Sequence, residues 1–595
     1  MKMTGKKQIY ISRIQNRMFF LAFVTAFVAA FTQTLAVFVD NAVVCAFYGE
    51  TEIAAVSLAG PFFYLLEIPA AGLAAGIQTV FAREIGAGQI DRVNRQFSMV
   101  FFFSAAVMAG VTLLAFLTVP QMAVLFGARG NTAALQPYAA DYLYGLSFEI
   151  LPYVLFCITV PAVVLDNGSR LVSIASVCGC AADIVLDLCS VWFGWGLFGI
   201  GAASAASALI YFLIVMLHFL KKDRIIRLKF ERIRFEELRE VFASSAPKAF
   251  QSLADAVKSV FYISLVSAAG GVMGTFVLSV HGTITYFVMI IASAVAGAAG
   301  TMTGICCGEK NGEELDGIGV LVGRYNFILS AAVISALLVI VRPLSVWLAG
   351  NAESVQLLRF AVYCIMAALP FSVLVQARIS SLQAVGHVKE ARRMAVANNF
   401  AALALLAGIL TPLFGVRGVF LSFPCAPLSV LMISWLLHWK KTGRITPSES
   451  DYLEVGDSFY AMPGDVISYP VRTKEECMLA SEQVILFCRG HKMTERTGYL
   501  AGLCMEEVTI NLFEHGMSQS SVIWSADIRV VIDGEHVIIR LRDNGRAFNL
   551  KMLTDRLMEE EINPESKTDL RILMGAAKDV AYYRTYGMNT TIIRV

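Results

Sequence analysis

Twelve apolar segments of about 20 or more residues constrain this chain more than any other feature. A helix of that length crosses the roughly 30 Å hydrocarbon core of a bilayer. A polar segment at residues 221–240 separates the first six from the last six. The segments lie at about residues 18–44, 53–82, 97–120, 136–165, 170–193 and 196–220, and then at 243–268, 272–306, 320–349, 355–385, 394–414 and 416–438.

The composition agrees with a chain that lies mostly in lipid. Hydrophobic residues make up 57% and charged residues 16%, against about 45–50% and about 25% in soluble domains. The first apolar segment is too long for the core of a signal peptide, so we interpret it as a membrane helix. The net charge of +2 excludes no partner by itself. The apolar composition makes the bilayer the expected partner, and we expect no nucleic acid.

The distribution of Lys and Arg predicts the orientation. Basic residues gather in alternate loops, and such loops face the cytoplasm. The sequence therefore predicts a multi-pass protein of the bacterial cytoplasmic membrane with both termini inside. The basic series comprises the N-terminus, residues 83–95, Arg170, and residues 221–239, 310–324, 378–393 and 440–444; the other loops hold only Arg129, Arg342 and Arg417.

An internal repeat relates the two sets of six. Residues 166–204 and 385–423 share a polar hook, an apolar run and a Gly-rich turn. Only the first copy carries two carboxylates inside its apolar run, Asp183 and Asp187. An ionised Asp at membrane depth costs at least ~2.5 kcal/mol, so such residues usually face a cavity or a partner. Parallel repeats with a central site are typical of transporters.

Residues 39–61, VDNAVVCAFYGETEIAAVSLAGP, with the AREIGAG loop and the stretch after Asp166, resemble the multidrug and toxic compound extrusion (MATE) family. The resemblance covers about residues 15–440. It implies a V-shaped, all-α, twelve-helix antiporter that exports small organic compounds, exchanges them for protons or sodium, and needs no cofactor. Asp40 stands where the family carries its coupling ion, and Asp183 and Asp187 stand where it has an Asn and an Asp. The alternative for Asp40 is a helix end at the membrane interface.

A second subgroup of the family uses an acid in the seventh helix and another in the tenth. Asp255 fits the first position, but Val373 stands near the second. Lys258, three residues after Asp255, favours a structural ion pair instead. His281 is a further candidate, either as a proton relay or as a satisfied polar group.

From about residue 465 the sequence is that of a soluble α/β domain. LAGLCMEEVTINLFEHG (residues 500–516) and LRDNGRAF (residues 541–548) resemble the ATPase fold, an α/β sandwich, of histidine kinases and anti-sigma serine kinases. That resemblance implies that Asn511 holds Mg²⁺ and that Glu507 is the catalytic residue of an active domain. It also implies that Asp543 and Gly545 receive the adenine of ATP. The segment expected to close over the phosphates, TDLRIL (residues 568–573), lacks glycine, so we expect no ATP turnover and no enzyme activity.

These patterns divide the chain into residues 1–220, a connector at 221–240 interpreted as an amphipathic helix on the membrane surface, residues 241–440, a linker at 441–464, and the tail at 465–595. The leading hypothesis is a cation-coupled efflux transporter whose tail regulates it by contact with the basic loops at 83–95 or 221–239. One alternative is a membrane receptor with a serine-kinase tail that acts on a protein partner. The other is a lipid-linked sugar flippase, although its cavity would be expected to be cationic, whereas the spans here hold mostly acids.

Overall fold

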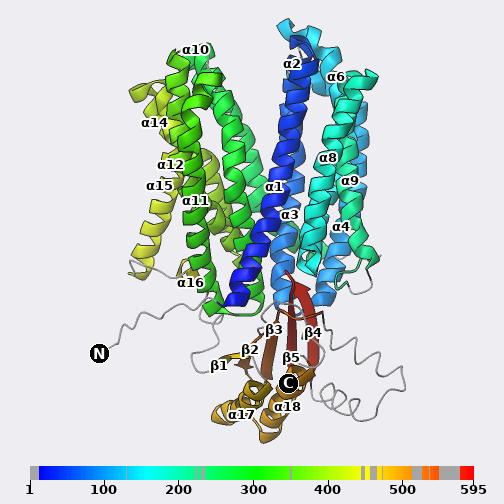
Figure 1. Ribbon diagram of the computed structural model, residues 1–595, viewed down its shortest axis with the longest axis vertical. Helices are drawn as coiled ribbons and strands as arrows, with labels where there is room; N and C mark the ends of the chain where they lie inside the picture. The colour runs from blue at the N-terminus through cyan, green and yellow to red at the C-terminus, as the bar shows by residue number, and fades with distance from the viewer. Residues whose placement is uncertain are drawn as a thin grey trace.

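The computed structural model describes residues 12–128, 130–221, 224–229, 235–348, 352–443, 449–453, 455, 465–471, 474–511, 526–534, 536–547 and 577–595. Long helices fill the membrane domain, residues 13–442, and form two halves (Figure 1). The N half comprises α1 (Arg13–Phe47), α2 (Glu50–Ser57), α3 (Gly60–Gly86), α4 (Ile90–Leu117), α5 (Val119–Leu125), α6 (Gln136–Ser147), α7 (Ile150–Val163), α8 (Ser169–Phe193) and α9 (Gly196–Met216), with short η1 (Gly130–Leu135), η2 (Val164–Gly168) and η3 (Leu217–Leu220). The C half comprises α10 (Phe235–Gly308), α11 (Gly312–Leu348), α12 (Ala352–Val385), α13 (Val388–Val396), η4 (Ala397–Ala401), α14 (Ala402–Phe414) and α15 (Val416–Thr442).

Among the described residues, eleven helical segments are long and apolar enough to cross a membrane. One of them, Ile150–Phe193, contains two helices, because Asp166 and Asn167 have non-helical backbone angles between α7 and α8. That break separates α8, the span expected at residues 170–193, from α6 and α7, which together make up the span expected at residues 136–165. The long α10 likewise contains two spans, which meet at Gly271, where φ is +55°.

Local signals explain where the helices begin and end. The Ser12 side chain accepts a hydrogen bond from the Gln15 amide and caps the start of α1. Gly194, with φ +68°, ends α8 and allows the tight turn into α9. Gly415, with φ +59°, has the corresponding place between α14 and α15. The Gly-rich turns of the sequence repeat are therefore helix ends in both halves.

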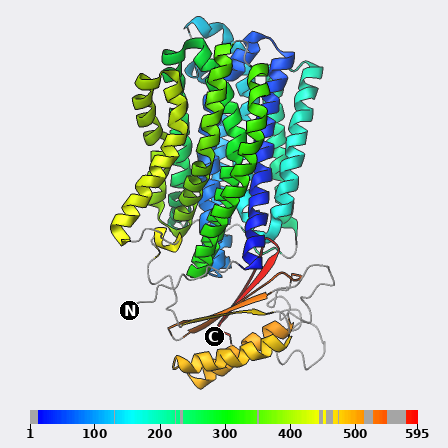
Figure 2. The same cartoon turned by 60° about the vertical axis from the view of Figure 1, so that its left-hand side comes forward.

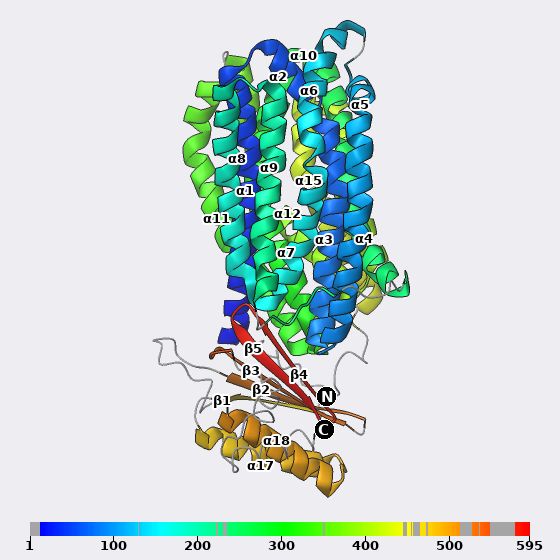
Figure 3. The ribbon, with the colours of Figure 1, turned by 90° about the vertical axis from the view of Figure 1, so that its right-hand side faces the viewer.

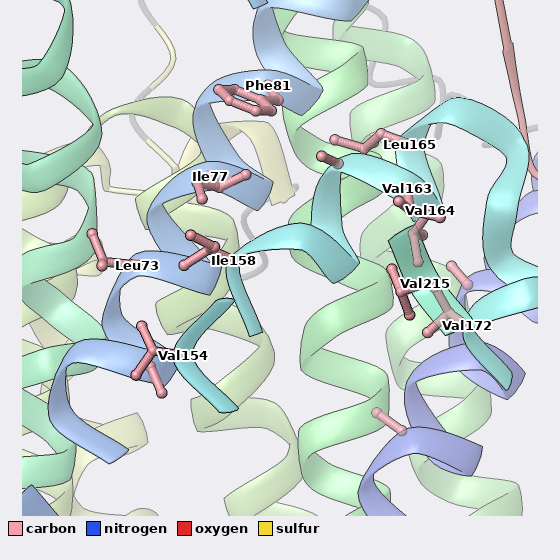
Figure 4. Packing of buried hydrophobic residues seen from close by; sticks show 14 of the residues in the cluster. Leu73, Ile77, Phe81, Val154, Ile158, Val163, Val164, Leu165, Val172 and Val215 are labelled. Carbon is pink, nitrogen blue, oxygen red and sulfur yellow. The ribbon is translucent and has the colours of Figure 1, made fainter. Parts of the chain in front are cut away.

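The core of the N half forms where α3 packs against α7. Leu73, Ile77 and Phe81 of α3 lie beside Val154 and Ile158 of α7 (Figure 4). All five side chains are buried. Because lipid tails are as apolar as these side chains, close packing rather than water exclusion holds such helices together.

The two halves meet at the end of the bundle that faces the tail and diverge toward the other end (Figure 1). Glycines bring the backbones of α3 and α10 together there: an added methyl group at Gly86 would overlap the Ile305 carbonyl, and one at Gly308 would overlap the Arg83 carbonyl. Gln78 of α3 also donates to the Gly297 carbonyl of α10 at 3.1 Å. The shape agrees with the expected V.

The tail is a five-stranded antiparallel sheet with strand order β1-β2-β3-β5-β4, covered on one face by two helices (Figure 2). Ile539 and Leu541 of β3 point into the core beneath the helices, whereas Arg540 and Arg542 point to the opposite face, toward the membrane domain. The elements are β1 (Val466–Val471), α17 (Lys474–Gly490), α18 (Glu495–Asn511), β2 (Ala526–Asp533), β3 (His536–Asp543), β4 (Asp579–Thr585) and β5 (Met588–Arg594).

One expectation about the two connecting segments, the helix predicted at residues 221–240, needs correction at residues 224–229. Residues 224–229 of the connector are not helical; the amides of Ile225 and Ile226 instead donate to the buried Asp166 carboxylate. The linker contains a short helix, α16 (Glu449–Tyr452), which begins where the Ser450 amide donates to Asp316 at 3.0 Å. Local hydrogen bonds to acidic side chains therefore hold both connections against the bundle.

Candidate functional site

A cluster of three carboxylates lies inside the N half. Asp40 is near the end of α1, and Asp183 and Asp187 lie one turn apart on α8. Asp187 is 0% exposed and Asp183 is 3% exposed. Asp40 interacts with both of the other carboxyl groups. The structure thus brings together all three residues singled out in the sequence.

The surroundings of the cluster supply few hydrogen bonds. Within the described part of the chain, both carboxylate oxygens of Asp187 and one oxygen each of Asp40 and Asp183 are buried without a hydrogen-bond partner. Ser207 of α9 contacts Asp183. Three close carboxylates without neutralising charge repel one another, and burial increases the penalty. The arrangement is therefore suited to take up protons or another small cation.

The described residues contain no group of three or more His, Cys, Asp or Glu side chains arranged to hold a metal ion.

The secondary candidates lie apart from this cluster, in the C half. Asp255 forms an ion pair with Lys258 and accepts hydrogen bonds from the Asn399 amide at 3.2 and 3.3 Å. The expected ion pair is therefore present, and Val373 is fully buried. His281 packs against Phe420 and Phe423. Its Nε2 has no hydrogen-bond partner among the described residues.

A second polar group in the N half was missed in the sequence. Glu67 of α3 accepts a hydrogen bond from the Tyr153 hydroxyl of α7 at 3.0 Å, and Gln33 of α1 donates to the same hydroxyl. Lys248, which belongs to the C half, attracts Glu67 electrostatically. The signal was available as one acid inside the apolar run FYLLEIPAAG.

The tail brings Asp543 and Gly545 together but leaves part of its proposed site outside the described residues. Asp543 Oδ1 accepts from the Gly545 amide at 2.7 Å and from Asn589 Nδ2 at 2.9 Å. Burial raises the pKa of Asp543 to about 6, although these hydrogen bonds oppose the shift. Glu507 lies on α18 four residues before Asn511, the last residue of that helix. The Asn511 side chain and residues 568–573 lie outside the described residues, so the expectations about Mg²⁺ and the missing glycines stay predictions.

Fold and repeat define a polytopic helical membrane protein with two six-helix halves. Residues 26–189 match the sequence profile of the MatE family. Solved structures of that kind resemble most of the chain: an outward-facing multidrug resistance MATE family transporter of the MOP superfamily is 20% identical, with a TM-score of 0.67 over 71% of this chain and 95% of that one.

Two further structures agree. A MOP superfamily transporter from Pyrococcus furiosus, described as having a binding pocket of reversed polarity, is 20% identical, with a TM-score of 0.67 over 73% of this chain and 97% of its own. A MATE protein in a bent conformation is 20% identical, with a TM-score of 0.64 over 72% of this chain and 97% of its own. No curated protein matches the chain in sequence. The membrane domain therefore has the MATE fold.

Proposed function

We propose that the protein is a secondary antiporter that exports small organic compounds in exchange for protons, with its tail on the cytoplasmic side. The single observation that carries this proposal is the buried cluster of Asp40, Asp183 and Asp187, in which four of the six carboxylate oxygens are buried without a hydrogen-bond partner within the described part of the chain. Protons bound there reduce the repulsion, and their release would accompany a change in conformation. The family profile and the fold support transport as the activity.

The charge pattern of the sequence supports the orientation. The end of the bundle that faces the tail carries Arg83, Arg92 and the other basic loops, as expected of the cytoplasmic side. In this orientation the halves diverge toward the outside. The acids at Glu67 and Asp40 favour cationic organic substrates, because opposite charges attract most strongly where water is scarce.

The variant Asp187→Asn tests the proposal. We expect it to abolish efflux driven by a pH gradient in inverted vesicles, because the amide cannot take up a proton. Expression and thermal unfolding should stay close to those of the wild type, since the substitution removes a buried charge. Asp141→Asn is the matched control, because Asp141 is an exposed acid on α6 of the same half. Efflux at the wild-type rate by Asp187→Asn would refute the assignment.

We also propose that the tail regulates transport. The tail contacts the membrane domain chiefly at the acidic turn between α10 and α11 and at the turn between α7 and α8. Among the described residues, the tail meets the basic segment 83–95 through a hydrogen bond from Arg594 to the Ala87 carbonyl at 2.8 Å, and Ala581 lies beside Gly88. Truncation after Arg444 should change the rate of transport without abolishing it. Phosphorylation of a protein by the tail would instead favour the receptor hypothesis.

A further inference from the structure

The tip of the β4–β5 hairpin lies between the two halves of the membrane domain. Thr585 and Met588 pair at the end of the hairpin, and the two residues between them, Tyr586 and Gly587, have φ values of +51° and +76°. Positive φ at both positions makes a tight turn that matches the twist of the strands. The turn is thus a narrow, rigid tip, and it reaches the base of the helices (Figure 3).

The tip contacts both halves. On the N half, the Thr585 hydroxyl donates to the Leu165 carbonyl at 2.6 Å, and the Gly587 amide donates to Asn167 Oδ1 at 2.8 Å. On the C half, the Tyr586 hydroxyl interacts with Thr301 of α10. Tyr586 is 2% exposed and belongs to the same buried apolar cluster as the helices of the membrane domain. One turn of the tail therefore bridges the two halves.

A buried charge network holds the sheet against the C half. Arg540 and Arg542 each form ion pairs with both Glu309 and Glu314. The nitrogen–oxygen distance to Glu314 is 3.0 Å for Arg540 and 3.1 Å for Arg542. The Tyr583 hydroxyl donates to Glu309 at 2.8 Å. Burial opposes the charge of the arginines, but the glutamates outweigh it and raise the pKa of Arg542 well above its usual value. Removing one partner of such a pair leaves an unpaired buried charge. We therefore expect the ion pairs of this network to form and break together.

The segments held by the tail are those that must separate if the halves open on the tail side. Leu165 and Asn167 lie at the end of the N half next to the tail, and Glu309 follows the last residue of α10 in the C half. The close packing of Gly86 on Ile305 lies at the same end. An opening there would pull the tip away from at least one half.

We propose that the β4–β5 hairpin is a plug that locks the two halves together on the tail side, and that the tail must withdraw before a substrate can enter from that side. This inference rests on the proposed transport function, because it gives that function its control. The docked tail holds the protein in the conformation open toward the other side. Release of the buried arginines from Glu309 and Glu314 is then the step that permits turnover.

The test measures distances between spin labels in the full chain, with labels placed as unnatural amino acids at Asp91 and Lys389. Both positions are exposed near the tail side, one in each half. The first variant is Tyr586→Ala. The second, Glu309→Gln with Glu314→Gln, leaves the tail sequence unchanged and so keeps the test valid if Tyr586→Ala fails to fold. The control is Asp533→Asn, which breaks the exposed pair of Asp533 with Lys310 at the edge of the same contact.

We expect the population with widely separated labels to rise about tenfold in both variants. The control should leave it unchanged, because exposed ion pairs contribute little. Tyr586→Phe, which keeps the buried ring but loses the hydroxyl contact with Thr301, should raise this population less than Tyr586→Ala does. Unchanged distances in both variants, or an equal change in the control, would overturn the plug.

The distances are recorded without substrate or ion gradient, so they do not depend on transport. A protein that transports nothing but opens in the variants would refute the proposed function and keep the plug. Normal transport with unchanged distances would support the proposed function and refute the plug.

Discussion

Asn589 Nδ2 donates to Asp543 Oδ1 at 2.9 Å, across the paired strands β5 and β3. The Asp543 carboxylate, which was expected to accept a hydrogen bond from adenine, therefore already accepts one from another residue of the tail. Asn589 also donates to the Arg546 carbonyl at 2.7 Å and accepts from the Tyr582 hydroxyl at 2.9 Å. The side chain of Asp543 is thus part of an internal network that fixes the end of the sheet.

The raised pKa of Asp543, about 6 against an ordinary 3.8, predicts a pH-dependent tail. Below about pH 4 the group is protonated in both the folded and the unfolded tail. Between about pH 4 and 6 only the unfolded tail releases the proton, so folding stability falls by roughly 3 kcal/mol as the pH rises. Asp543→Asn should remove this loss. Amide exchange of β3 and β5 in the full chain, at about pH 5 and 7.5, measures it; equal pH dependence in both proteins would contradict the prediction.

The same network predicts weak nucleotide binding. An adenine amino group would have to compete with the Asn589 and Gly545 donors for Asp543, and the sequence at 568–573 lacks the glycines of a phosphate lid. We expect little or no ATP binding in calorimetric titrations of the full chain. Asn589→Ala removes one of the donors that occupy Asp543. It should therefore not weaken the binding of ATP. Tight binding with hydrolysis would disprove this and support the kinase alternative.

Glu67 should contribute to substrate recognition. Its carboxylate is half-buried between α1, α3 and α7 and is held by Tyr153. We expect Glu67→Gln to lower the transport of cationic dyes about tenfold or more, because a charge-assisted contact is worth about 1.5–3 kcal/mol. Neutral substrates should be transported as before. Asp141→Asn, at an exposed acid on α6, is the control, and an equal loss for neutral and cationic dyes would contradict a role in charge recognition.

The glycine contacts between the halves predict a stability effect. Gly308→Ala would place a methyl group against the Arg83 carbonyl and the Ala87 amide. We expect it to destabilise the protein by about 1–3 kcal/mol, the usual range for overpacking. Gly323→Ala is the matched control, because no atom lies within 4 Å of the added group, and it should be neutral or slightly stabilising. Thermal unfolding in detergent measures the stability of the two variants. A loss for Gly323→Ala equal to that for Gly308→Ala would contradict the prediction.

Local sequence signals predicted the helices, the break near Asp166 and the two carboxylates of α8, because apolar run length, glycine turns and acids inside apolar runs are visible residue by residue. Asp40 was identified through the family resemblance. The docking of the tail could not be predicted in this way. Arg540, Arg542 and Glu309 read as an ordinary charged strand and loop until the fold places them face to face. Glu67 was visible as a single acid inside an apolar run, but only the approach of Tyr153 and Lys248 shows that it belongs to a site.

The last prediction concerns the coupling ion. Asp255, the acid that a sodium site of the C half would need, is already paired with Lys258 and Asn399, and Val373 offers no ligand. The cluster around Asp187 holds three acids. The family pattern, in which an Asn stands at the position of Asp183, would leave only Asp40 and Asp187. Extra like charge favours proton uptake. We expect a pH gradient alone to drive transport and a sodium gradient at fixed pH to drive none.

Two variants make this prediction sharper. Asp183→Asn restores the family pattern and should shift the pH at which transport is half-maximal downward, because one repelling charge is removed from Asp187. Asp255→Asn should leave that pH unchanged, since Asp255 lies in the other half. Transport in proteoliposomes with imposed proton or sodium gradients measures both. A sodium requirement that disappears in Asp255→Asn would show that the coupling site lies in the C half instead.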